Sequence, residues 1–255
     1  MTKQILILLS ILFVIRLAEC RSASRWGGEL SQKYKRYPRV RTARKEKSSE
    51  IDSLFSANKI EYPSKVFIRV FKLENELELW AYRDSDSQYV LLKTYPICAS
   101  SGRLGPKRRE GDYQVPEGFY KIIDFNPSSN FYLSMKIDYP NASDRVLSDK
   151  KHPGGDIFIH GSCVTIGCIP ITDEFIKELF VIVLDSKDLG YDVPVHIFPC
   201  RFDEKNCIDS LKNNTAFDTF WKNIKIGYDY FEKYRKLPKI RVGKDGKYIF
   251  NIEGK

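Results

Sequence analysis

Two residues of the types used in acyl transfer, His160 and Cys168, lie at the two ends of one short segment. Residues 156–160 have the apolar, β-rich composition of a buried strand, and His160 is predicted where that strand ends. Cys168 follows Gly167, which has no side chain to block a substrate approaching the thiol. A cysteine attacks as its thiolate, and a nearby imidazole is its usual activator. The pair therefore predicts an enzyme with Cys168 as nucleophile and His160 as base.

Cysteines also have structural roles, and three alternatives stay open for Cys163. It is expected to pair with Cys98, to pack as a small apolar side chain, or to bind zinc with His160 and Cys168. Zinc needs three or four ligands, and no second Cys/His pair of ligand spacing is present in the sequence. The sequence therefore predicts no metal and no cofactor. The alternative for Cys168 itself is an inert buried thiol or half of a disulfide.

A basic run, Lys107-Arg108-Arg109, lies in a loop rich in Gly, Pro and Arg. One interpretation is a solvated loop. The other is that these cations hold a substrate carboxylate through charge-assisted hydrogen bonds. The sequence does not separate the two.

The first 20 residues have the pattern of a secretory signal peptide. Lys3 precedes an apolar run from Ile5 to Ile15, which is too short to span a bilayer but suits a signal core. Cleavage after Cys20 predicts an exported protein of the periplasm or cell envelope. The alternative is a lipoprotein anchored through a lipid on Cys20.

The net charge of +9 belongs mainly to one segment. Between Arg21 and Lys47 there are ten Lys or Arg residues and two acids. Residues 21–50 are therefore predicted to be a basic flexible linker that suits an anionic membrane or wall surface, or that is only a solvated tether. Nucleic acid is not an expected partner of an exported protein.

Residues 51–200 are predicted to form one mostly β catalytic domain, because apolar and polar residues alternate along several segments. A helix starting at Thr172 has an apolar stripe and follows the proposed nucleophile. The predicted strands cover 66–70, 77–82, 89–96, 119–125, 131–137, 156–160 and 193–198.

The C-terminal extension, 201–255, differs in character. Its aromatic residues between Phe217 and Phe231 recur at steps of three and four, as on an amphipathic helix, and a hairpin is expected around 243–246. We expect these aromatics to be core residues that pack the extension on the catalytic domain. Cys200 and Cys207 are close enough in sequence to form a local disulfide, although the sequence does not settle connectivity.

Residues 160–168, HGSCVTIGC, resemble the active-site signature of the L,D-transpeptidase catalytic domain family (the YkuD fold). The similarity is to the branch with the signature HG-x-C-x-S/T-x-GC, which includes murein transpeptidases and an amidase that releases protein from peptidoglycan. It covers about 65–200. Further similar segments are Ser101-Gly102, 105–107, 116–120, 139–142 and 220–223.

Three features of this segment depart from the family. The spacing from His160 to Cys168 is shorter than in most members, though like this branch. Ile166 stands two before the cysteine, where the family has histidine. Pro170 stands where many relatives have arginine. These departures leave the nucleophile and the base in place, and they do not specify the acceptor.

The resemblance implies a fold that is mainly β with α, a YkuD-like β-sandwich catalytic domain with a C-terminal α/β-hairpin extension. It also implies acyl transfer through a Cys168 thioester, with peptidoglycan stem peptides as substrate. Backbone N–H groups at Gly167 and Cys168, in the turn with Thr165, would hold the oxyanion, and the Gly161 carbonyl would orient His160.

Two alternatives to a transpeptidase remain. One is a hydrolytic amidase or carboxypeptidase that uses the same acyl-enzyme to cleave peptidoglycan or to release a wall-linked protein. The other is a wall-binding module without catalysis. The retained Cys168 and His160 weigh against the second, since a binding module has no need of a thiol.

Overall fold

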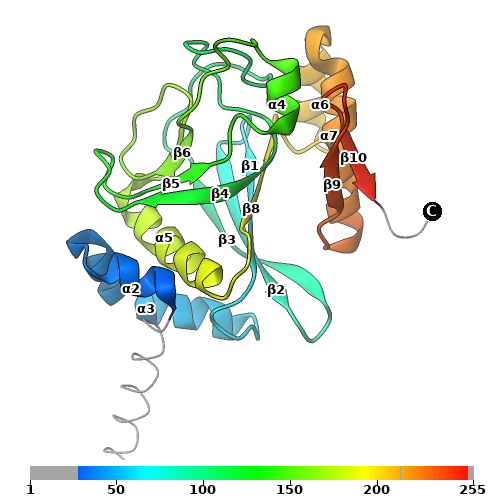
Figure 1. Ribbon diagram of the computed structural model, residues 1–255. Helices are drawn as coiled ribbons and strands as arrows, with labels where there is room; N and C mark the ends of the chain where they lie inside the picture. Colours follow the sequence, from blue (N-terminus) through cyan, green and yellow to red (C-terminus); the bar gives the residue numbers. More distant parts are fainter. Residues whose placement is uncertain (1–27, 213, 252–255) are drawn as a thin grey trace, which may run out of the picture.

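A computed structural model describes residues 28–212 and 214–251. Its centre is one curled mixed sheet with the strand order β3-β2-β1-β8-β4-β5-β6-β7 (Figure 1). Most neighbours are antiparallel, whereas β1 pairs with β8 and β6 with β7 in parallel. The strands are β1 (Val66–Phe71), β2 (Glu76–Arg83), β3 (Gln88–Pro96), β4 (Gly118–Asn126), β5 (Ser134–Ile137), β6 (Phe158–His160), β7 (Ile169–Pro170) and β8 (Pro194–Phe198).

Both faces of the central strands are covered, and β1 shows how the sequence achieves this. Successive side chains of a strand point to opposite faces. Ile68 and Val70 therefore belong to the core on one face, while Phe67 and Phe71 pack with the C-terminal extension on the other. In β8, His196 lies between the rings of Phe67 and Phe119 and is a structural residue. Its burial holds the His196 pKa well below the ordinary 6.5.

Three helices cover the first face. Helix α5 (Thr172–Asp188) packs its apolar side on the sheet, and α2 (Glu29–Lys35) and α3 (Pro38–Ala57) pack on α5 (Figure 1). The N-terminus of α2 is held by α5, since the Asp188 carboxylate accepts hydrogen bonds from the backbone N–H of Leu30 and Ser31. Such a carboxylate satisfies two of the N–H groups that a helix start leaves unpaired.

These two helices correct the expectation that residues 21–50 form a flexible linker. The segment is helical from Glu29, and its boundary at residue 50 falls inside α3. Buried residues recur along α3 at steps of three and four: Val40, Ala43, Arg44, Lys47, Ile51 and Phe55. Two of these are cations, and acids on α5 neutralise them: Arg44 pairs with Asp185 and Lys47 with Glu174. Because the stripe contains charged residues, the sequence pattern concealed it.

The extension covers the second face. It consists of α6 (Lys205–Lys212), a short 3₁₀ turn (Thr215–Phe217), α7 (Asp218–Tyr234) and the hairpin β9 (Lys239–Val242) and β10 (Tyr248–Asn251). The buried side chains of α7 are mainly aromatic, and they pack against Phe71, Phe119 and Phe198 of the sheet. A disulfide joins Cys200 to Cys207 at the start of the extension.

The predicted fold class, mainly β with α and a C-terminal α/β-hairpin extension, is confirmed. The helix α4 (Ala142–Leu147) was not predicted, and residues 131–133 of one predicted strand form a loop instead. The predicted signal peptide, 1–20, lies outside the described residues. Within 28–212 and 214–251, no helix combines the length and the apolar character needed to cross a bilayer.

Candidate active site

His160 and Cys168 are brought together by two short parallel strands. Strand β6 ends at His160, and in β7 Ile169 is level with Ile159 and Pro170 with His160. Cys168, directly before β7, is therefore level with Phe158, whose backbone N–H bonds to its thiol. Phe158 and His160 lie on the same side of the strand because side chains alternate. His160 and Cys168 thus lie on adjacent paired segments at the edge of the sheet.

The His160 imidazole is buried and oriented. Its side chain is 1% exposed, and Phe131 packs on the ring with centroids 4.7 Å apart. Nδ1 lies 2.5 Å from the carbonyl oxygen of Gly161, the partner that the family resemblance implied. A proton on Nδ1 donated to that carbonyl leaves Nε2 as the nitrogen that can accept a proton. Burial also lowers the pKa of His160 below its ordinary 6.5, so the ring is neutral near pH 7.

Cys168 is the one cysteine outside a disulfide in the described part of the chain. Its thiol donates to the carbonyl oxygen of Asp156 at 3.6 Å. Burial raises the pKa of the thiol above the ordinary 9.0, the nearby Asp156 carboxylate raises it further, and Lys107 and the Phe158 N–H act against this. The raised thiol pKa and the lowered imidazole pKa favour the same resting state. This state is a neutral thiol beside a neutral imidazole rather than an ion pair.

The loop between the base and the nucleophile is fixed at both ends. Gly161 N–H donates to the Leu133 carbonyl, and Ser162 N–H donates to the Asp173 carboxylate at 2.7 Å. A side chain at Gly161 would meet that carboxylate at 2.5 Å, so glycine is needed here. At the other end, Thr165 Oγ1 donates to the Cys168 carbonyl at 2.8 Å.

Thr165 also accepts the Gly167 N–H, at 3.1 Å. Gly167 has a φ of 134°, a conformation that glycine alone adopts readily. The expected pair of oxyanion donors is therefore reduced, because the Gly167 N–H is already used within the turn.

A disulfide fixes the middle of the same loop. Cys163 is bonded to Cys98, which follows β3, and the two are 65 positions apart in sequence. This selects one of the three alternatives for Cys163 and removes it as a zinc ligand. Within 28–212 and 214–251, no group of three or more His, Cys, Asp or Glu side chains is arranged to hold a metal ion.

The three cations of the basic run have different environments. Lys107 is buried, and its Nζ is held by the Asp112 carboxylate at 2.6 Å and by the Arg109 carbonyl. Arg108 lies over the ring of Phe220 and pairs with Asp144. Arg109 is exposed. The first two therefore have structural partners, whereas the Arg109 side chain is open to solvent.

Asp156, Asp173 and Phe131 were missed by the sequence analysis. Asp173 was visible as an acid in the first turn of a helix, but its partner across the loop was not. Asp156 contacts the thiol through its backbone carbonyl, which no side-chain pattern reveals, and its carboxylate also raises the thiol pKa. Phe131 was assigned to a strand, whereas it lies in the β4–β5 loop and packs on His160. Ile166, at one of the departures from the family, is 74% exposed.

Comparisons with known proteins match the part of the chain that contains this site. The family model described as L,D-transpeptidase catalytic domain matches residues 67–197, which include β1 to β8 almost entirely. The chain is 41% identical over 189 residues to the protein named "Putative L,D-transpeptidase YafK" of Escherichia coli strain K12. That match covers 73% of this chain and 74% of the relative.

Solved structures resemble the chain less closely. One is the helical cell shape determining protein Pgp2 of Campylobacter jejuni (K307A mutant), with 23% identity and a TM-score of 0.44, covering 72% of this chain and 67% of that one. Another is Bd1075 of Bdellovibrio bacteriovorus, with 23% identity and a TM-score of 0.39, covering 67% and 61%.

Proposed function

Because the chain belongs to the L,D-transpeptidase catalytic domain family, we propose that it is a cell-envelope cysteine acyltransferase acting on peptidoglycan stem peptides. The observation that supports this best is the parallel pairing of β6 with β7, because His160 ends β6 and Cys168 directly precedes β7. In this proposal, Cys168 forms a thioester with the donor peptide and His160 moves the proton.

The first half of the reaction begins from the neutral pair. His160 Nε2 takes the thiol proton, which in the resting state points to the Asp156 carbonyl, and Cys168 Sγ attacks the carbonyl carbon on the carboxyl side of a diaminopimelate-type residue. The C–N bond then breaks, and the imidazolium gives its proton to the leaving amine. An ordered acceptor for Nδ1, the Gly161 carbonyl, stabilises the imidazolium that forms between these steps.

The negative oxygen of the tetrahedral intermediate requires hydrogen-bond donors. Since the Gly167 N–H is donated to Thr165, we assign the oxyanion role to the Cys168 N–H, with Thr165 and Gly167 holding the turn that directs it. One such donor contributes roughly 3 kcal/mol to the transition state.

The second half depends on what attacks the thioester. An amine gives a crosslink or an amino-acid exchange, and the protein is then a transpeptidase. Water gives an amidase or carboxypeptidase, including one that releases a wall-linked protein. Both routes share the acyl-enzyme, so they are separated by products rather than by the residues around Cys168.

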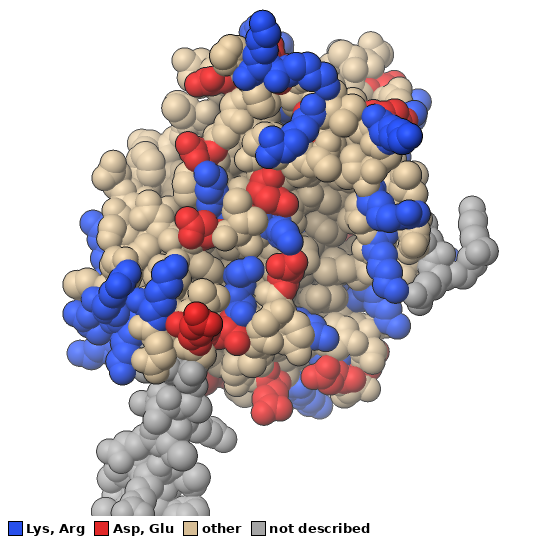
Figure 2. Space-filling view, in the orientation of Figure 1, with Lys and Arg blue, Asp and Glu red and all other residues tan. Residues whose placement is uncertain are grey.

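The location proposed for this activity is the cell envelope. The leader-like residues 1–20 support export, with a lipid on Cys20 as the alternative anchor. The basic segment becomes a folded surface instead of a linker, and Figure 2 shows Lys and Arg gathered over the region of α2 and α3. We propose that this surface lies against anionic lipid or wall polymer. Its exposed cations are Lys33, Lys35, Arg36, Arg39, Arg41 and Lys45.

Product analysis tests the proposal. The full chain is incubated with tetrapeptide muropeptides and a free D-amino acid, beside the Cys168→Ala variant, and the products are weighed by mass spectrometry. Dimers or exchanged stems that are lost in the variant support transpeptidation. Tripeptide formed by water alone supports the hydrolase. Identical mixtures from both proteins, with wall material retained by both, would contradict catalysis and favour the binding module.

A further inference from the structure

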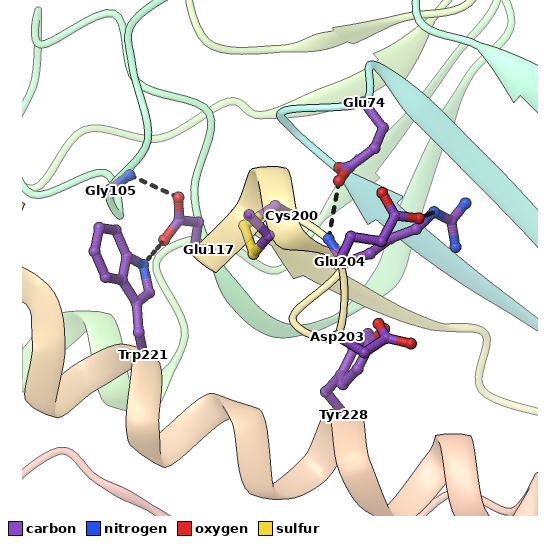
Figure 3. The surroundings of a disulfide bond; sticks show 10 residues. Glu74, Gly105, Glu117, Cys200, Asp203, Glu204, Trp221 and Tyr228 are labelled. Atoms are coloured by element: carbon purple, nitrogen blue, oxygen red, sulfur yellow. Dashed lines mark hydrogen bonds and ion pairs between the residues drawn. A yellow bond between two sulfur atoms is a disulfide. The ribbon is translucent and has the colours of Figure 1, made fainter. Parts of the chain in front are cut away.

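A fully buried carboxylate joins three separate parts of the chain beside the candidate site. Glu117, directly before β4, is 0% exposed. Its Oε1 accepts from the Gly105 N–H at 2.7 Å and from Lys72 Nζ at 2.9 Å, and its Oε2 accepts from Trp221 Nε1 at 2.7 Å. Figure 3 shows Glu117 between Gly105 on the β3–β4 loop and Trp221 on α7. The sheet, this loop and the C-terminal extension therefore share one anion.

The β3–β4 loop, residues 97–117, borders the proposed nucleophile. Val115, Ile97 and Ala99 line a small pocket together with Cys168. A side chain at Gly167 would lie 3.1 Å from the Gln114 carbonyl. The same loop carries Cys98 of the disulfide and Lys107, whose charge lowers the thiol pKa. A displacement of this loop would thus change the surroundings of Cys168 directly.

The extension holds the same loop from its outer side. The ring of Phe217 lies where a side chain at Gly105 would be, at 2.6 Å. Asn214 Nδ2 donates to the Leu104 carbonyl at 3.3 Å. Further along, the Arg108 guanidinium lies over Phe220, 4.9 Å from the ring centroid. Every one of these partners comes from residues 214–221, so the extension contacts the loop as one unit.

We propose that Trp221 is a positioning residue, which acts through Glu117 to hold the β3–β4 loop against the Cys168 site. The C-terminal extension is then part of the active-site architecture rather than a separate appendage. This inference rests on the proposed function for its consequence in turnover, although its effect on the thiol environment is independent of the substrate.

The physical reason is the cost of leaving a buried anion short of a donor. Without the Trp221 N–H, Oε2 of Glu117 loses its partner in a site closed to water, a much larger penalty than the loss of an exposed hydrogen bond. Rotation of the carboxylate toward another donor would release the Gly105 N–H, which it holds now. The loop would move away from Cys168, and Lys107 would move with it.

The test replaces Trp221 by Phe, which keeps an aromatic ring and removes only the N–H donor. The chain offers a matched control in Trp80→Phe, because Trp80 Nε1 also donates to a buried carboxylate, that of Glu78, at 2.8 Å. The ring of Trp80 packs on Phe231 and not on a residue of the β3–β4 loop. Each variant and the wild type are measured at the same number of degrees below their own Tm, which corrects for a general loss of stability.

Two measurements need no substrate. Hydrogen exchange of residues 104–117 should become at least ten-fold faster in Trp221→Phe only. The pH midpoint for alkylation of Cys168 by iodoacetamide should rise by about half a unit or more as Lys107 withdraws. The groups that act on this thiol are Lys107, Asp156 and the Phe158 N–H, together with His160 as the proposed base on the paired strand. Acyl transfer should fall about ten-fold or more.

The outcomes separate this inference from the proposed function. If the wild type shows no turnover but the alkylation midpoint and loop exchange still change in Trp221→Phe alone, the positioning role stands and the proposed substrate is wrong. If both variants match the wild type in exchange and in midpoint, or the midpoint falls, the inference is overturned. Glu117→Gln serves as a second variant and should give the same shifts, since a neutral amide weakens the bonds from Lys72 and Gly105.

Discussion

At the scale of single residues, the chemistry depends on how burial sets the protonation of two side chains. Burial lowers the pKa of His160 and raises that of Cys168, so both groups rest in their neutral forms. In the proposed mechanism, the histidine therefore acts as a base during attack instead of holding a preformed thiolate. The two residue types and their spacing were sufficient to predict this pair from the sequence. Their protonation states could not be predicted from the sequence, because they depend on neighbours such as Asp156, Lys107 and Phe131.

The neutral pair predicts the pH dependence of kcat/KM for acyl transfer. Activity is lost when His160 becomes protonated, and its lowered pKa places the half-maximal rate of the acid limb below pH 6.5. At pH values between this acid limb and the pKa of the thiol, which lies above 9.0, kcat/KM should be nearly constant. Steady-state kinetics from pH 4.5 to 10 with tetrapeptide substrate measure both limbs. An acid limb centred above pH 7 would contradict a His160 pKa that burial lowers.

Thr165 gives a second prediction at this scale. Its hydroxyl bonds both the Gly167 N–H and the Cys168 carbonyl, so Thr165→Val should loosen the turn that directs the Cys168 N–H. We expect a loss of about ten-fold or more in kcat, equivalent to about 1.4 kcal/mol. Thr165→Ser keeps the hydroxyl and is the control, with activity within a few-fold of the wild type. Equal losses in the two variants would exclude the hydroxyl as the cause.

At the scale of elements, the sequence predicted the strands and α7 well but not the helices α2 and α3. Strands such as β1 and β4 have simple apolar patterns, and α7 has a purely apolar and aromatic stripe. The buried stripe of α3 includes Arg44 and Lys47, which are neutralised by residues more than 120 positions later in the chain. No local pattern contains that information, and the high charge therefore indicated disorder.

The Cys98–Cys163 disulfide should matter to both stability and site. It closes a separation of 65 residues, so Cys98→Ala/Cys163→Ala should lower the free energy of unfolding by about 4 kcal/mol in the chain-entropy estimate. Cys200→Ala/Cys207→Ala, which opens a separation of 7, should lower it by about 2 kcal/mol. Denaturant unfolding without reductant measures both. The first pair should also reduce acyl transfer; unchanged turnover would mean that the loop keeps its shape without the bond.

At the scale of the whole molecule, the sheet lies between two helical layers, and each layer contacts a loop next to the site. The layer of α5, α2 and α3 supplies Asp173 to the loop after His160, and Arg39 of α3 donates to the Ser129 and Tyr132 carbonyls of the loop that carries Phe131. The extension supplies Trp221 from the other side. The sequence indicated that an extension packs on the domain. These long-range contacts, however, depend on the assembled sheet and could not be predicted from the sequence.

The N-terminal helices should be an integral part of the fold. Arg44 and Asp185 are 4% and 3% exposed, and Arg44 Nη1 lies 2.8 Å from Asp185 Oδ2. Arg44→Met leaves a buried carboxylate without its cation and should lower the free energy of unfolding by about 3–5 kcal/mol. Arg44→Met/Asp185→Leu should recover part of that loss. Lys225→Met, which breaks an exposed pair with Asp229, is the control and should cost less than about 1 kcal/mol in denaturant unfolding.

The central claim is that Cys168 carries the acyl group, and intact-protein mass spectrometry tests it most directly. The full chain is mixed with tetrapeptide muropeptide without an amine acceptor, quenched in acid within seconds, weighed and mapped by peptide. We predict an added mass equal to the donor acyl group on the peptide that contains Cys168, its disappearance when a D-amino acid is supplied, and its absence in Cys168→Ala. Product formation by Cys168→Ala at the wild-type rate, or an adduct on another residue, would contradict the account.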